Sequence, residues 1–116
     1  MKTSTSLKNN YEFRRLYNKG KSAAALNVVV YCRKNRKPYN QVGFTVGTKV
    51  GKAVTRNLIR RRLREVYRRN EESFSAGWDI VIVARTRSPL ATYSELERDM
   101  LYLFDRLGLR GAGQGK

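Results

Sequence analysis

The sequence predicts an α+β fold, a two-layer sandwich in which helices pack on a small mixed sheet. Two kinds of periodicity predict it. Apolar residues recur at helical spacing in residues 59–67 and 96–107, and they alternate with a period of two in residues 26–33, 42–46 and 78–84. With a short helix before the first strand, the expected order is helix, strand, strand, helix, strand, helix.

Composition predicts a polyanionic partner. The chain has 116 residues, so we expect residues 1–116 to form a single domain with one modest core. Its 25 lysines and arginines against 9 acidic residues give a formal net charge of +16. Such a basic domain is typical of proteins that bind nucleic acid. No apolar run is long enough to span a membrane, so no membrane partner is expected.

Both ends of the chain are expected to be flexible. Residues 1–8 are polar and residues 109–116 are rich in glycine. The N-terminus also lacks the apolar region of a signal peptide. Cys32 is the only cysteine, so neither an internal disulfide nor a cysteine-based metal site can form. We therefore expect a cytoplasmic protein.

The first helix is expected to begin after Asn9 or Asn10, either of which can cap it. Phe13, Leu16 and Tyr17 share one face of this helix because they are spaced three and four residues apart. For Leu16 the spacing indicates a place in the core. For the two aromatic residues, core packing and contact with a ligand are equal alternatives.

The strand pattern suggests a hairpin followed by a central strand. Residues 26–33 alternate as a half-buried strand, residues 34–40 form a turn, and residues 42–46 alternate again, so we expect an antiparallel hairpin. Gly43 places no side chain on one face of the second strand, which leaves room for another group to approach the backbone. Residues 78–84 are apolar on both faces, which predicts the central strand of the sheet.

The central helix, which follows a loop at residues 48–52 and ends near Asn70, has two contrasting faces. Its apolar face consists of Ile59, Leu63, Val66 and Tyr67. A second arc, the arginine ridge, consists of Asn57, Arg60, Arg61, Arg64 and Arg68, with Arg56 at its edge. Like charges four residues apart destabilise a helix by about 0.2–0.5 kcal/mol per pair. A polyanion along the ridge would remove this repulsion, and guanidinium groups suit bidentate contacts with phosphate.

Groups that could carry out catalysis are scarce. The chain has no histidine, and Cys32 falls on an apolar strand face, where we expect an inert thiol. Thr92 and Glu95 form a capping box for the last helix. Glu95 and Asp99 are expected to form surface pairs rather than a metal site. The loop before the central helix is similar to a phosphate-binding loop, but Ala53 occupies the place of the required Ser or Thr, which excludes a nucleotide site.

A composite motif gives a more specific indication. It consists of Lys49, Gly51, Ala53, Val54, Arg56, Asn57, Arg60, Arg61 and Arg64. The motif resembles the signature of the protein subunit of bacterial ribonuclease P, and the resemblance covers roughly residues 7–107. It implies a ferredoxin-like, ribosomal-S5-like fold of the predicted element order, with a left-handed β-α-β crossover.

The resemblance also implies a function. In that family the RNA subunit carries out the Mg²⁺-dependent hydrolysis that removes the 5′ leader from precursor tRNA, and the protein binds both RNAs. We therefore expect one protein per ribonuclease P RNA, Mg²⁺ bound mainly by that RNA, and no catalytic or metal-binding residue in this chain. The expected contacts with the catalytic RNA are Lys49, Lys52, Arg56, Asn57, Arg60, Arg61, Arg64 and Arg68. The expected contacts with the leader are Phe13, Tyr17, Tyr31, Arg56 and Asn57.

Two alternative functions share part of this pattern. A small structural RNA-binding protein of the ribosomal type would share the size and charge, although not the composite motif or the aromatic residues of the first helix. A metal-dependent nuclease acting alone would need clustered acidic residues, which the sequence lacks.

Overall fold

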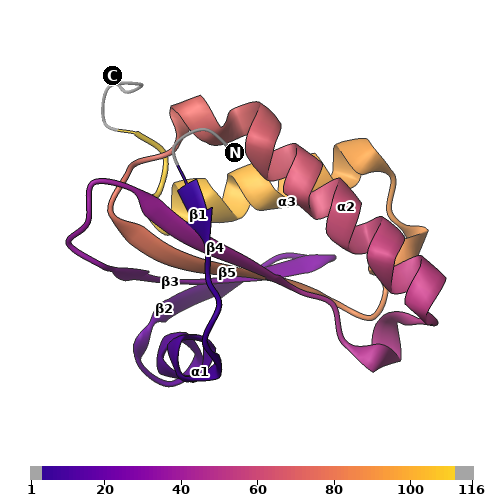
Figure 1. Cartoon of the computed structure of the whole chain (residues 1–116). Helices are drawn as coiled ribbons and strands as arrows, with labels where there is room; N and C mark the ends of the chain where they lie inside the picture. The colour runs from indigo at the N-terminus through magenta and orange to yellow at the C-terminus, as the bar shows by residue number, and fades with distance from the viewer. Residues whose placement is uncertain (1–3, 112–116) are drawn as a thin grey trace.

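The computed structural model describes residues 4–111 as a five-stranded mixed sheet with helices on both faces (Figure 1). The strands are β1 (Ser4–Ser6), β2 (Lys21–Ala24), β3 (Val28–Lys34), β4 (Asn40–Thr45) and β5 (Trp78–Ala84). The helices are α1 (Asn10–Lys19), α2 (Ala53–Asn70) and α3 (Tyr93–Arg106), with short 3-10 turns η1 (Thr48–Val50), η2 (Glu71–Ser73) and η3 (Ser88–Leu90). The predicted α+β class is confirmed.

Strand β5 lies at the centre of the sheet, whose order is β1-β4-β5-β3-β2. It pairs in parallel with β4 and antiparallel with β3, and Ile82 is in register with both Phe44 and Val30. The central position of β5 is as predicted, but the predicted hairpin of β3 with β4 is wrong. The two strands are separated by β5 because that strand is apolar on both faces, and an edge position would leave it half exposed.

The hairpin that does form joins β2 to β3. Lys21 pairs with Cys32, and Ala24 pairs with Val29. The connection is tight, since the amide of Ala25 donates to the carbonyl of Val28 at 2.8 Å. The sequence pattern does not predict β2, because this mostly exposed edge strand has no apolar alternation.

Both ends of the described chain pack against the rest of the fold. Strand β1 pairs in parallel with β4, and Leu7 beside it is buried. At the other end Leu109 is fully buried, and Arg110 forms a β-bridge with Phe74. Within the ends that were expected to be flexible, residues 4–7 and 109–111 are thus held by backbone pairing and apolar burial. Residues 1–3 and 112–116 lie outside the described part of the chain.

Helices α2 and α3 cover one face of the sheet and enclose the main core (Figure 1). The predicted apolar face of α2 is confirmed, because Ile59, Leu63, Val66 and Tyr67 are all at most 1% exposed. Helix α3 contributes side chains at the predicted spacing, namely Leu96, Met100, Leu103, Phe104 and, just after the helix, Leu107. Within residues 4–111, no helix has the length and apolarity that a membrane crossing requires.

Helix α1 lies on the opposite face of the sheet and crosses its strands (Figure 1). Leu16 is buried there, as predicted, and packs with Leu7 and Val81. Phe13 and Tyr31 are partly buried against the same cluster. The sheet therefore has helices on both faces. The predicted two-layer sandwich corresponds to the sheet together with α2 and α3.

Gly43 provides the space that lets α1 approach the sheet. A β-carbon built at this position would lie 2.7 Å from two ring atoms of Phe13, closer than real contacts allow. The group expected to approach this backbone is therefore the ring of Phe13. The ring of Phe13 fills the space above a strand that has no side chain there, and Phe13 remains half-buried.

We expect Gly43→Ala to lower the free energy of unfolding by about 1–3 kcal/mol, because the Phe13 ring would have to leave its position. Urea denaturation checks this. Gly47→Ala is the matched control, since a β-carbon at Gly47 meets nothing within 4 Å. In a Phe13→Leu background the cost of Gly43→Ala should shrink, and an undiminished cost would show that Phe13 is not the obstacle.

Candidate nucleic-acid interface

The loop before α2 brings two lysines and the first ridge residue to one end of the sheet. Lys49 lies in η1 and Lys52 is the N-cap residue of α2, and both are exposed. Gly51 has a φ of 155°, which favours glycine, and a β-carbon there would lie 3.1 Å from the Thr55 side chain. Arg56 donates from Nε to the carbonyl of Gly51 at 3.1 Å, so its guanidinium also fastens the turn.

The arginine ridge lies on the part of α2 that faces away from the core. Asn57, Arg61, Arg64 and Arg68 are exposed, and Arg56 and Arg60 are half-buried. Within the ridge, Arg60 donates from Nη1 to Oδ1 of Asn57 at 2.9 Å. The structure therefore gathers the residues expected to contact the catalytic RNA on the outer surface of α2 and on the turn that precedes it.

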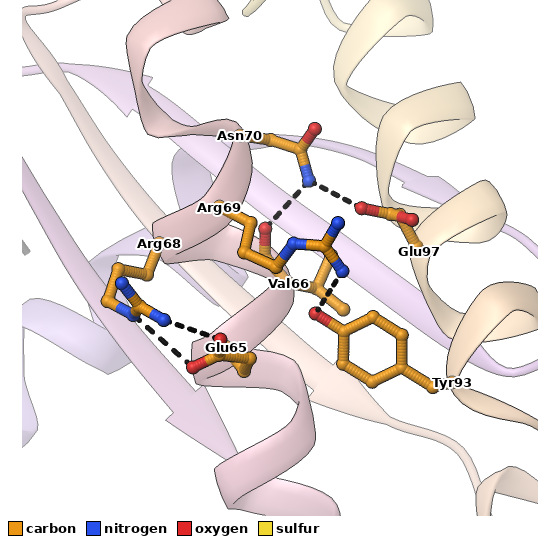
Figure 2. Close-up of polar contacts among 7 residues, drawn as sticks. All are labelled: Glu65, Val66, Arg68, Arg69, Asn70, Tyr93 and Glu97. Atoms are coloured by element: carbon orange, nitrogen blue, oxygen red, sulfur yellow. Dashed lines mark hydrogen bonds and ion pairs between the residues drawn. The ribbon is translucent and has the colours of Figure 1, made fainter.

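The guanidinium groups of the ridge differ in how far they are already engaged. Figure 2 shows Arg68 paired with Glu65, with Nε donating to Oε1 at 3.2 Å. Both side chains are about half exposed, so the pair contributes little to stability. The guanidinium of Arg64 lies 5.7 Å from the ring centroid of Phe44. In the described part of the chain, neither Arg61 nor Arg64 pairs with a carboxylate. Arg61 is therefore the least engaged arginine of the ridge within the described residues.

The end of α2 is attached to α3 (Figure 2). Arg69, which lies off the ridge, has its guanidinium 5.7 Å from the ring centroid of Tyr93 and donates to the Tyr93 hydroxyl at 3.5 Å. Asn70 donates from Nδ2 to Oε2 of Glu97 at 2.9 Å and to the carbonyl of Val66 at 2.8 Å. These contacts orient the last turn of α2, so Arg69 has a structural role.

Two tyrosines form an aromatic pair between α1 and β3. The rings of Tyr17 and Tyr31 meet edge to face, with centroids 4.9 Å apart and planes at 81°. Tyr17 is 40% exposed, and its hydroxyl lies 3.3 Å from Oγ1 of Thr45. Thr45 is the last residue of β4, a few residues before Lys49. The tyrosine pair therefore lies at the end of the sheet where the basic loop begins.

The three aromatic residues expected to contact the leader are thus not equivalent. Tyr17 is exposed, whereas Tyr31 and Phe13 are both half-buried, and Phe13 also packs above Gly43. Thr45, whose hydroxyl contacts that of Tyr17, is not among the predicted site residues. The signal that could have found it is the two-residue period, which puts Thr45 on the same strand face as Gly43.

The acidic residues of α3 have structural roles. Asp99 is buried, and its Oδ2 accepts hydrogen bonds from the amide and Nδ2 of Asn27 at 2.9 and 3.0 Å. The predicted surface pairing of Asp99 is therefore wrong, because this carboxylate caps a loop instead. The predicted capping box is confirmed: Glu95 accepts from the Thr92 amide at 2.8 Å, which lowers the pKa of Glu95.

The Cys32 thiol lies buried in β3. Burial raises the pKa of the Cys32 thiol to about 11, although Lys21 opposes the shift, so this thiol is protonated at neutral pH as predicted. Across residues 4–111, no three histidine, cysteine or carboxylate side chains gather into a group that could hold a metal ion. What the surface offers is positive charge and aromatic area.

Comparisons with known proteins agree on one family. The sequence model of the family described as Ribonuclease P matches residues 1–108. The ribonuclease P protein component of Alkaliphilus oremlandii (strain OhILAs) is 41% identical over 109 residues, covering 94% of this chain and 96% of the relative. That of Clostridioides difficile (strain 630) is 43% identical over 101 residues, covering 86% of this chain and 89% of the relative.

Solved structures give the same result. The ribonuclease P protein of Staphylococcus aureus superposes with a TM-score of 0.84 and 28% identity, covering 91% of this chain and 97% of the other. That of Thermotoga maritima superposes with a TM-score of 0.80 and 31% identity, covering 87% and 96%. The chain therefore belongs to the ribonuclease P protein family, whose members are the protein component of a ribonucleoprotein endoribonuclease.

Proposed function

We propose that this protein binds the catalytic RNA of ribonuclease P through the arginine ridge and the 5′ leader of precursor tRNA through Tyr17 and Tyr31, so that the complex removes the leader. The observation that carries this proposal is the tyrosine pair, in which Tyr17 is exposed and Tyr31 half-buried, located where β4 leads into Lys49, Lys52 and the ridge. A single-stranded leader can stack on the rings while the cations contact phosphates.

The chemistry of the two contacts differs. Stacking of a base on an aromatic ring contributes about 1–3 kcal/mol and tolerates any base, which suits leaders of varied sequence. Phosphate contacts by arginine release counterions, so their contribution falls steeply with salt. Asn57 and Arg56 lie at the first turn of α2, next to the basic loop, and we assign them to the boundary between leader and catalytic RNA.

The proposed complex contains one copy of this protein per RNA, in the cytoplasm. We assign the Mg²⁺ ions that hydrolysis requires to the RNA subunit. The protein contributes fixed positive charge through the ridge, Lys49 and Lys52. This charge lowers the electrostatic repulsion between the two RNAs. Without the protein, bound Mg²⁺ would have to offset that repulsion. The protein should therefore matter most when Mg²⁺ is scarce.

Cleavage by a bacterial ribonuclease P RNA at low Mg²⁺, with and without this protein, tests the proposed function. We expect cleavage at the mature 5′ end of tRNA to need both components at low Mg²⁺, and the protein requirement to weaken as Mg²⁺ rises. Tight binding to structured RNA without any stimulation would instead favour a structural RNA-binding protein of the ribosomal type.

The ridge assignment predicts a specific loss of affinity for the catalytic RNA. Arg60→Ala with Arg64→Ala should raise the Kd and flatten the dependence of log K on log salt by about 0.9 per lost phosphate contact. The charge-matched control is Arg98→Ala with Arg106→Ala, which removes two exposed arginines of α3 from outside the ridge. Filter binding over a salt series measures both pairs, and equal losses for the two would contradict the ridge assignment.

The tyrosine pair should distinguish precursor from mature tRNA. We expect Tyr17→Leu or Tyr31→Leu to weaken precursor binding to the reconstituted complex by about 1–3 kcal/mol, because leucine keeps apolar packing but cannot stack on a base. Binding of mature tRNA should not change. Tyr102→Leu, which alters a similarly exposed tyrosine on α3, is the control. Equal losses for both tRNAs would mean that the pair supports the fold only.

A further inference from the structure

Helix α1 divides its face of the sheet into two unlike regions. On one side Tyr17 contacts Tyr31 and Thr45. On the other side, Tyr11 and Arg15 face the end of the sheet where β3 turns into β4, and a hollow of about 600 Å³ lies there. The tyrosine pair and this hollow thus lie on the two flanks of one helix.

The hollow is strongly cationic. Its positive charge comes from Arg15, Arg33, Lys34, Arg36 and Lys37. The proposed function uses none of these five side chains.

The two acidic side chains of the hollow already have hydrogen-bond partners. Glu12 accepts from the backbone amide of Asn9 at 3.2 Å, and Asp79 accepts from Nδ2 of Asn35 at 3.0 Å. Neither carboxylate forms an ion pair with the hollow's cations in the described structure. The lining therefore has an excess of positive charge, with polar groups that suit an anion.

The loop that presents these cations is held in one conformation by Asn35. Its Nδ2 donates to Asp79 and, at 3.3 Å, to the carbonyl of Tyr39, while its Oδ1 accepts from the amide of Lys37 at 2.8 Å. The same network holds Arg36 at a φ of 62°, a conformation that non-glycine residues rarely adopt. Glycine or asparagine would adopt this positive φ at a lower conformational cost than arginine, so the turn by itself does not explain an arginine at position 36.

The strands connect the hollow to the tyrosine pair. Arg33 lies two residues beyond Tyr31 on β3, so both side chains are on the same face, about 7 Å apart along the strand. On β4, Gln41 lines the hollow while Thr45 holds Tyr17 at the opposite end. On this face of the sheet, the tyrosine pair lies next to the basic loop that precedes α2. The hollow lies on the far side of α1.

We propose that this hollow binds phosphates in the 5′ part of the precursor leader, upstream of the nucleotides that stack on Tyr17 and Tyr31. The proposal rests on the proposed function of the tyrosine pair and extends it. A leader long enough to pass α1, whose diameter is about 10 Å, reaches Arg33 and Arg36, and a shorter leader does not. The hollow therefore makes affinity depend on leader length and not on leader sequence.

The test measures Kd for the reconstituted ribonucleoprotein with precursor tRNAs whose leaders grow one nucleotide at a time. The variant is Arg33→Gln with Arg36→Asn, because asparagine tolerates a positive φ and the loop should remain folded. The charge-matched control is Arg98→Gln with Arg106→Gln, which removes two exposed arginines from α3. Thermal melting checks that each protein is folded.

We expect wild type and variant to bind short-leader substrates equally and the variant to bind several-fold more weakly once the leader passes a threshold length. The salt dependence for long leaders should flatten by about 0.7 per lost phosphate contact. Identical curves at every length would overturn the proposal. A loss that is equal at all lengths, accompanied by weaker binding of the catalytic RNA alone, would overturn it as well, because the phosphates would then belong to that RNA.

The wild-type curve separates this proposal from the proposed function. A wild-type complex that binds precursor no better than mature tRNA would contradict the leader contact itself. If the wild-type complex prefers precursor and the variant has the same Kd as wild type at every leader length, only the role of the hollow is excluded. The tyrosine contact would then still stand.

Discussion

The burial of β5 on both faces is the constraint on which the rest of the structure depends. Ile80 and Ile82 face the main core, and Val81 faces the cluster beneath α1, and all three are fully buried. A strand of this composition needs neighbours on both edges and cover on both faces. That requirement separates β3 from β4 and places α1 opposite α2 and α3. It also puts Tyr31 and Thr45 on the face that α1 crosses, where the tyrosine pair forms.

Helix α2 combines a stabilising face with a destabilising one. Burying a Leu, Ile or Val side chain contributes about 1.5–3 kcal/mol, whereas a like-charge pair on a helix costs about 0.2–0.5 kcal/mol. Ile59, Leu63 and Val66 therefore outweigh the repulsion of the ridge, and the fold tolerates its like charges. Contacts of Arg69 and Asn70 with α3 fix the end of the helix. The ridge is thus presented on a well-anchored element without needing ion pairs of its own.

Helix α1 serves the fold and the proposed binding surface through different residues. Phe13 fills the space above Gly43, and Leu16 packs on Val81, so these two fix the helix on the sheet. Tyr17 is held by Thr45 and Tyr31 yet keeps exposed ring area. The spacing that puts all three residues on one helical face could not separate these roles, because burial depends on what each residue meets across the sheet.

The sequence by itself determined the features that lie within one element: the apolar face and arginine ridge of α2, the spacing along α3, its capping box and the central character of β5. These follow from helical and strand periods and from one short capping motif, all of which are local. Only the tertiary structure decided the strand order, the edge strands β1 and β2, the Asn27–Asp99 contact and the hollow beside Asn35. Those features depend on backbone pairing and on contacts between distant residues, and neither leaves a periodic signal in the sequence.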